Sequence, residues 1–283
     1  MMVHFINGEY INKDDVSVSI DDRGYYFGDG VYEVIKVYDG ELYTAHEHLS
    51  RLFSSAEKIK IDISFTESEL LQVAKELLTR NKISNGQVYM QVTRGVAPRQ
   101  HNFPSQEVLP MLTAYALETK RPLDAIEKGV SVKSVIDVRW LLCDIKSLNL
   151  LGSVLAKQEA KEANCFEALL HRDGFVTEGS STNIFGVKEG VVYTHPATNL
   201  VLNGITRQVV LRLCNELAIP CVEKEFTLEE AFNMDELFLT STTSEIMPIT
   251  KLDGQPIGNG QPGLQTKRLT EAFNLQIPVS KMK

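Results

Sequence analysis

The chain has 283 residues, of which 43% are hydrophobic and 23% charged, a composition typical of a soluble globular protein. Its formal net charge of −8 argues against nucleic acid or an anionic membrane as the main partner. No apolar run approaches the roughly 20 residues of a membrane span, and no basic segment followed by an apolar stretch indicates a signal peptide.

The four cysteines, Cys143, Cys165, Cys214 and Cys221, form no CxxC pair and share no metal-ligand spacing with histidine. Cys214 and Cys221 could pair, but a reducing, cytoplasmic setting without a metal site is the simpler interpretation.

The first half of the chain predicts hairpins and two helices. Asn7-Gly8 and Asp39-Gly40 supply the positive φ that two-residue turns require. Apolar residues recur with a helical period from His48, and Thr66 with Glu69 forms a capping box that starts a second helix. The expected elements are hairpins over 5–11 and 37–43, helices from His48 and from Thr66, and strands over 87–94 and 110–117.

The polar segment 118–122, which contains Pro122, follows a strand and predicts a domain boundary. We therefore expect domains over residues 1–120 and 121–283.

The second half again mixes strands on hairpins with helices. Its expected elements are a strand over 130–138, a helix through Val154 and Ala163, hairpins at Asp173-Gly174 and Glu189-Gly190, a helix over 205–217, a short helix capped by Thr227 and Glu230, and a strand over 236–240. Strands and helices do not alternate strictly, so an α+β fold is favoured over a Rossmann sheet. The absence of GxGxxG weakens any nicotinamide interpretation.

Lys146 stands out because its sequence neighbours, among them Leu142, Ile145 and Leu148, are apolar. Burial of a lysine lowers its pKa, and a neutral amine can form a Schiff base with a carbonyl. On this spacing alone, a lysine whose stem crosses apolar surface while its head reaches water is the commoner situation.

Four further features suggest a ligand that carries phosphate. Residues 177–183 place Glu178 before a glycine and a run of hydroxyls, and residues 202–207 open a helix whose free N–H groups suit phosphate. Residues 239–245 form a hydroxyl-rich turn, and Arg51 could bind phosphate through two parallel bonds. Each feature alone also fits an ordinary turn, helix cap or surface arginine.

A lysine for a Schiff base, a carboxylate for a ring nitrogen and several phosphate-binding segments together match the needs of pyridoxal phosphate. The chain resembles the fold-type IV pyridoxal-phosphate enzymes, and among them the D-amino-acid aminotransferases. The resemblance rests on residues 22–34, 92–95, 143–149, 177–183 and 241–245, which follow one another in the family's order.

The resemblance implies a two-domain fold, with a smaller N-terminal α/β domain and a larger C-terminal domain built on a barrel-like sheet. It implies that Lys146 anchors the cofactor and moves protons, that Glu178 pairs with the pyridine nitrogen, and that Leu202 lies beside the ring. It assigns the phosphate to Arg51, Thr242 and the amides of Ile205 and Thr206. The substrate α-carboxylate is assigned to Tyr32, with Arg99 and His101 reaching in from the partner of a homodimer.

The implied reaction is transamination by a ping-pong mechanism, from D-alanine to 2-oxoglutarate. Branched-chain L-amino-acid aminotransferases and aminodeoxychorismate lyases share the lysine and the glutamate, so these residues do not discriminate. Residues 23–34, together with Arg99-Gln100-His101, favour the D-specific enzyme. A non-catalytic cofactor-binding protein is a further alternative.

Overall fold

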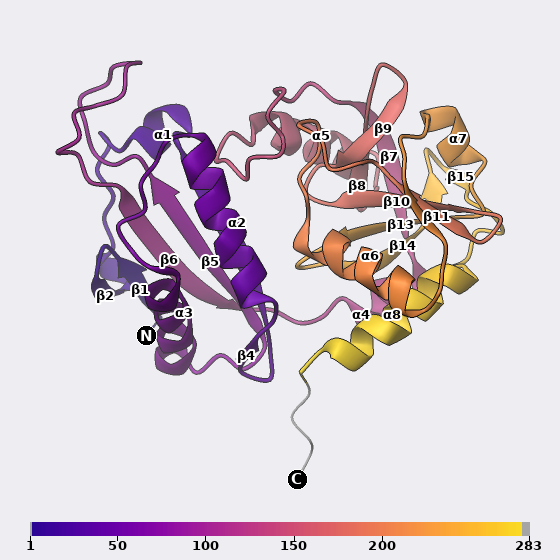
Figure 1. Ribbon diagram of the computed structural model, residues 1–283, viewed down its shortest axis with the longest axis horizontal. Coiled ribbons are helices and arrows are strands. Elements are labelled where there is room, and N and C mark those ends of the chain that lie inside the picture. The colour runs from indigo at the N-terminus through magenta and orange to yellow at the C-terminus, as the bar shows by residue number, and fades with distance from the viewer. Residues whose placement is uncertain (1, 279–283) are drawn as a thin grey trace, which may run out of the picture. The chain divides into compact units, whose positions relative to one another are not determined.

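The computed structural model describes residues 2–278, which form two compact units that we treat separately (Figure 1). The described part of the first unit comprises residues 2–120, 145–149 and Pro278. The second unit comprises residues 121–144 and 150–277.

The first unit is built on a six-stranded antiparallel sheet with the order β2-β1-β6-β5-β3-β4. Its elements are β1 (Val3–Ile6), β2 (Glu9–Asn12), α1 (Arg23–Phe27), β3 (Gly30–Tyr38), β4 (Glu41–Leu42), α2 (Ala45–Lys58), α3 (Glu67–Asn81), β5 (Gly86–Thr93) and β6 (Met111–Glu118), with a 3₁₀ turn at Lys13–Asp15. Both α2 and α3 pack against this sheet (Figure 1). Apolar side chains such as Ile35, Leu52 and Leu77 form the core of the unit.

Local sequence signals in the first unit were read correctly. Both hairpin turns have positive φ at their two residues, and Thr66 makes the predicted capping box with Glu69 at the start of α3. The helix predicted from His48 begins at Ala45. Helix α1 was not predicted. It has only five residues, too few for a periodic pattern, and the side chain of Asp22 caps it.

Residues 145–149 join the first unit, although the sequence analysis placed them in the second domain. Ser147 forms a β-bridge with Val31, and the N–H of Leu148 donates to the carbonyl of Gly30 at 3.0 Å. The segment thus continues the sheet alongside the start of β3. Such a pairing between distant segments depends on backbone hydrogen bonds and leaves no signature in the local sequence.

The second unit is built on a nine-stranded mixed sheet. Its main path is β12-β11-β10-β13-β14-β7-β8-β9, and β15 pairs with β14. The strands are β7 (Val130–Ile136), β8 (Glu167–Arg172), β9 (Phe175–Gly179), β10 (Asn183–Lys188), β11 (Val191–Thr194), β12 (Cys221–Glu223), β13 (Glu236–Ser241), β14 (Glu245–Leu252) and β15 (Gln255–Pro256). The sheet curls, so that β9 at one end contacts β10 near the other. This half-barrel confirms the predicted barrel-like sheet.

Five helices of the described chain accompany this sheet: α4 (Leu123–Lys128), α5 (Leu151–Glu162), α6 (Ile205–Glu216), α7 (Leu228–Phe232) and α8 (Leu264–Gln276). The predicted hairpins at Asp173-Gly174 and Glu189-Gly190, and the Thr227–Glu230 capping box, are present. Helices α4 and α8 and strand β14 were not predicted. Strand β14 is buried at every residue but Lys251, so it lacks the alternation that marks a half-buried strand. None of the helices within residues 2–278 is long and apolar enough to cross a membrane.

Candidate active site

Lys146 is positioned by two elements of the first unit. Its Nζ lies 4.3 Å from the centroid of the Tyr32 ring on β3. Its backbone N–H donates to Ser55 Oγ on α2 at 3.2 Å, and its carbonyl accepts the N–H of Tyr32 at 3.0 Å. The lysine that carries the predicted chemistry and the tyrosine that carries predicted substrate binding are therefore neighbours.

Several of the apolar sequence neighbours of Lys146 are exposed. Leu141, Leu142 and Leu151 are 61%, 47% and 72% exposed and belong to the second unit, while Ile145 is buried in the first. Lys146 is itself half-buried. The expectation of an apolar setting was thus wrong for these leucines, because a run of apolar residues does not reveal which surface each side chain faces.

Arg51 on α2 is held by a buried carboxylate that the sequence analysis missed. Glu33 on β3 is fully buried and accepts Arg51 Nε at 2.6 Å and Nη2 at 3.0 Å. His48 Nδ1 lies 2.7 Å from Glu33 Oε2, the oxygen that also accepts Arg51 Nη2. The available signal was a glutamate in the alternating apolar face of β3, between Val31 and Ile35.

The charge of Glu33 is set by these partners. Burial alone would raise its pKa, but Arg51 and His48 together lower the pKa of Glu33 to about 2. Burial lowers the pKa of His48, against the opposing effect of Glu33. Glu33 is therefore ionised across the physiological range, and it fixes the direction of a guanidinium whose side chain is only 13% exposed. Arg51 is therefore not an ordinary surface arginine.

Arg99 and His101 contact helix α1. The Arg99 guanidinium carbon is 5.2 Å from the centroid of the Phe27 ring on α1, and the His101 ring is 5.5 Å from it. Tyr32 instead stacks on Tyr89 with centroids 5.6 Å apart. Among the described contacts of the first unit, Tyr32 meets Lys146, whereas the other two predicted carboxylate ligands meet α1.

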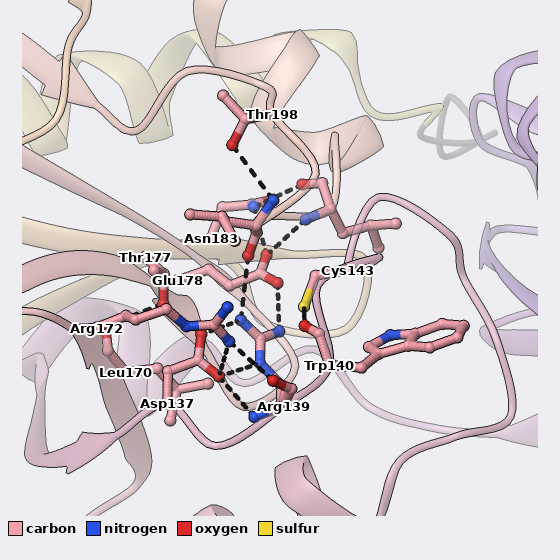
Figure 2. Close-up of polar contacts among 12 residues, drawn as sticks. Asp137, Arg139, Trp140, Cys143, Leu170, Arg172, Thr177, Glu178, Asn183 and Thr198 are labelled. Carbon is pink, nitrogen blue, oxygen red and sulfur yellow. Dashed lines mark hydrogen bonds and ion pairs between the residues drawn. The ribbon is translucent and has the colours of Figure 1, made fainter.

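Glu178 lies on β9 in the second unit and is 5% exposed (Figure 2). Its Oε1 accepts Arg139 Nη1 at 2.5 Å, and its Oε2 accepts Asn183 Nδ2 and the N–H of Leu202, both at 3.0 Å. Burial raises the pKa of Glu178, and Arg139 and the Leu202 amide only partly offset this effect. Of the two oxygens, Oε1 has one donor and Oε2 has two.

Arg139 is in turn held by Asp137, and neither residue was predicted (Figure 2). The guanidinium of Arg139 binds both oxygens of Asp137, through Nε at 2.9 Å and Nη2 at 2.8 Å. Burial would raise the pKa of Asp137, but its bonds to Arg139 lower it to about 2. The charged pair follows β7 at i and i+2, which is an arrangement too common to be recognised from the sequence.

Asn183 connects Glu178 with the segment that precedes α6. Its Nδ2 also donates to the carbonyl of Leu202 at 2.8 Å, and a Cβ added to Gly204 would lie 2.1 Å from Asn183 Oδ1. Gly204 therefore allows the start of α6 to approach the sheet closely. Glu178 near the end of β9 and Asn183 at the start of β10 lie on either side of the three-residue connection 180–182, which brings the two side chains together.

The start of α6 offers backbone donors. Its N-cap, Gly204, makes no side-chain capping bond, so the amides of Ile205 and Thr206 in the first turn are not satisfied by a cap. Thr242 follows β13, whose Thr240 pairs with Asn183. The second unit thus brings Glu178, Leu202, Ile205 and Thr206 together through Asn183, with Thr242 on the neighbouring strand end.

The donor set of the second unit fits pyridoxal phosphate. A carboxylate offers about four acceptor positions, and the described residues occupy three of those on Glu178. The remaining position, on Oε1, suits the N–H of a pyridinium ring. Uncapped amides at the start of a 12-residue helix suit a phosphate. No group of three or more potential metal ligands occurs within residues 2–278.

Comparisons with known proteins agree with this chemistry. The amino-transferase class IV family matches residues 30–252. A D-alanine aminotransferase of Staphylococcus haemolyticus is 49% identical over 273 residues, which cover 96% of this chain and 97% of that protein.

Solved structures of branched-chain amino acid aminotransferases share the fold. That of Escherichia coli has a TM-score of 0.91 at 26% identity and covers 99% of this chain and 97% of that one. The structure of the T.th. enzyme with pyridoxamine 5'-phosphate has a TM-score of 0.89 at 28% identity, covering 96% of this chain and 92% of that one.

Proposed function

We propose that this chain, which belongs to the class IV aminotransferase family, transfers the amino group of D-alanine to 2-oxoglutarate and releases pyruvate and D-glutamate. The observation that carries the proposal is the near-complete match to a D-alanine aminotransferase, at almost twice the identity of the branched-chain enzymes. The two half-reactions follow a ping-pong order, in which pyruvate leaves before 2-oxoglutarate binds.

The cofactor is pyridoxal phosphate, whose protonated ring accepts electrons from the substrate Cα. Lys146 supplies the covalent anchor and moves the proton at Cα through Nζ. Glu178 holds the ring nitrogen in its protonated form, because a buried anion favours a cation beside it. The donors from Arg139, Asn183 and Leu202 keep that carboxylate oriented.

Arg51, Thr242 and the amides of Ile205 and Thr206 bind the cofactor phosphate in this proposal. The support in the first unit is that Glu33 and His48 fix the direction of Arg51. The support in the second unit is the uncapped start of α6. The side chain of Leu202 packs against the ring while its backbone bonds Glu178 and Asn183.

Tyr32, Arg99 and His101 bind the substrate α-carboxylate, the last two from the partner of a homodimer. In one chain Arg99 and His101 contact Phe27 on α1, whereas Tyr32 contacts Lys146, which supports a set completed by a second chain. Helix α5 also exposes Leu151, Val154 and Leu155 by more than half, as a helix does when a partner covers it. The four free cysteines suit a reducing cytoplasm.

Half-reactions distinguish this function from its rivals. We expect D-alanine to convert the bound cofactor, seen as loss of its absorption band, far faster than L-alanine or L-leucine. L-Leucine in first place would favour a branched-chain enzyme, and pyruvate release from 4-amino-4-deoxychorismate would favour a lyase. A spectrum that D-alanine leaves unchanged would mean a non-catalytic binding protein.

Mixed dimers test the shared site. Lys146→Ala subunits are expected to be inactive, and Arg99→Ala subunits nearly inactive at D-alanine concentrations far below their raised Kd. After mixing under conditions that exchange subunits, heterodimers with one complete site should recover part of the activity. If mixing restores nothing although heterodimers are isolated, Arg99 acts within its own chain or not at all.

A further inference from the structure

A cluster of buried charges in the first unit lies outside the chemistry described above. Asp29, just before β3, accepts Arg23 Nε at 2.8 Å and Arg94 Nε at 2.9 Å through one oxygen. Its other oxygen accepts Arg94 Nη2 at 3.0 Å. The three side chains are only 4–12% exposed. Burying three charges is costly, so their arrangement calls for an explanation.

Arg23 connects this cluster to the loop that carries Arg99 and His101. Its Nη1 donates to the carbonyl of Gln100 at 2.6 Å and to that of Asn102 at 3.2 Å, so it holds the backbone on both sides of His101. Arg94 contacts the end of the same loop, with its guanidinium carbon 3.7 Å from the centroid of the Phe103 ring.

Phe27 gives the loop side chains a common surface. The guanidinium carbons of Arg23 and Arg99 lie 4.9 Å and 5.2 Å from its ring centroid, and the His101 ring lies 5.5 Å away. A cation is attracted to the face of an aromatic ring. Helix α1 holds this ring in place between the Asp22 cap and Gly28, which has a φ of 64°.

We propose that Arg23, held by Asp29, is a positioning residue that fixes the loop of Arg99 and His101, and that Phe27 sets the direction of both side chains. The inference rests on the proposed role of these two residues as ligands of the substrate α-carboxylate. A loop ordered before binding loses less conformational freedom when the carboxylate arrives, so the affinity for carboxylate substrates is higher.

The experiment compares D-alanine with D-alaninol, in which a hydroxymethyl group replaces the carboxylate. Single-turnover reactions of the holoenzyme yield an apparent Kd and a limiting rate for each substrate. Arg23→Lys keeps a positive charge beside Asp29 but cannot also reach two carbonyls, and Phe27→Leu removes the ring. Arg99→Ala is the reference variant. Val73→Ala, a core truncation on α3, is the control for lower stability alone.

We expect Arg23→Lys to raise the apparent Kd of D-alanine about tenfold, the size of a lost charge-assisted bond. Phe27→Leu should raise it about two- to fivefold, as expected for an exposed cation–π contact. Neither should change the Kd of D-alaninol or the limiting rates more than Val73→Ala does. Amide hydrogen exchange of residues 100–103 should speed up in Arg23→Lys and stay unchanged in Val73→Ala.

Equal losses for both substrates, or unchanged D-alanine binding, would overturn the positioning role. If Arg23→Lys does not fold, Phe27→Leu decides the question alone. If Arg99→Ala itself shows no loss selective for the carboxylate, the proposed carboxylate site is wrong. A selective loss in Arg99→Ala without one in the Arg23 and Phe27 variants rejects only the positioning role.

Discussion

Each unit contains a buried glutamate paired with an arginine, and we propose opposite roles for the two pairs. In the first unit Glu33 is fully buried and directs Arg51, the proposed phosphate ligand. In the second unit Arg139 is directed by Asp137 and bonds Glu178, the proposed ligand of the ring nitrogen.

The remaining partners of each pair explain the difference. Glu33 accepts from Arg51 and His48 on its two oxygens, and its pKa falls to about 2. Arg139 faces two carboxylates, and Asp137 takes its Nε edge, so only Nη1 reaches Glu178. The pKa of Glu178 is raised by burial that its donors do not outweigh. The comparison teaches that the further partners of such an ion pair set the charge and the direction of its members.

The largest effect is expected from Lys146→Ala, which stops turnover without touching either pair. It removes the proposed covalent anchor and proton carrier, so steady-state transfer from D-alanine to 2-oxoglutarate should be abolished. The free energy of unfolding in urea should stay within about 1 kcal/mol of the wild type, because Lys146 is half-buried. Near-normal turnover without added amine would refute its role.

Glu178→Gln changes the member of the second pair that is proposed to bind the ring nitrogen. An amide cannot hold the ring nitrogen protonated by its charge, so the half-reaction with D-alanine should slow by about 10²-fold or more. Stopped-flow measurement of the cofactor absorption gives this rate. An unchanged rate would mean that Glu178 does not face the ring.

Glu33→Gln removes the carboxylate that directs Arg51. We expect its main effect on the free energy of unfolding rather than on the rate. Arg51 and His48 would remain buried without their carboxylate, which costs about 3–5 kcal/mol of unfolding free energy. Cofactor affinity should also fall, while the half-reaction of the saturated enzyme stays within a few-fold of the wild type. A rate loss as large as that of Glu178→Gln would contradict the division of roles.

The smallest and most gradual effect is the loss of stability at acidic pH. Folding lowers the pKa of Glu33 from 4.5 to about 2 and that of Asp137 from 3.8 to about 2. Each carboxylate therefore contributes stability that is complete above its unfolded pKa and is lost as pH falls towards 2. Urea midpoints measured from pH 7 to 3 should decline more slowly in Glu33→Gln than in the wild type.

Glu178 serves as the contrast in that experiment, because its pKa is raised rather than lowered. A carboxyl group with a raised pKa favours the folded state as pH falls. In Glu178→Gln the urea midpoint should therefore fall with decreasing pH at least as steeply as in the wild type. If Glu178→Gln and Glu33→Gln flatten the decline equally, the two carboxylates do not differ as proposed.

Signals confined to a few neighbouring residues could be read from the sequence alone. Turn pairs such as Asn7-Gly8 need only local backbone conformation, and the Thr66–Glu69 capping box spans a single helical turn. Lys146, Glu178 and the hydroxyl-rich segments were recognisable because their chemistry is carried by residue type and order. The family followed from these motifs, and the α+β fold followed from the order of the expected strands and helices.

Pairings between distant segments were decided only by the tertiary structure. Glu33 meets Arg51 because α2 packs on β3, and Glu178 meets Arg139 because β7, which Arg139 follows, and β9 both pair with β8. The segment of Lys146 joins the first unit through β3, although most of its sequence neighbours belong to the second. Hydrogen bonds and burial depend on positions in space, and residues far apart in the chain acquire these only when the sheets have formed.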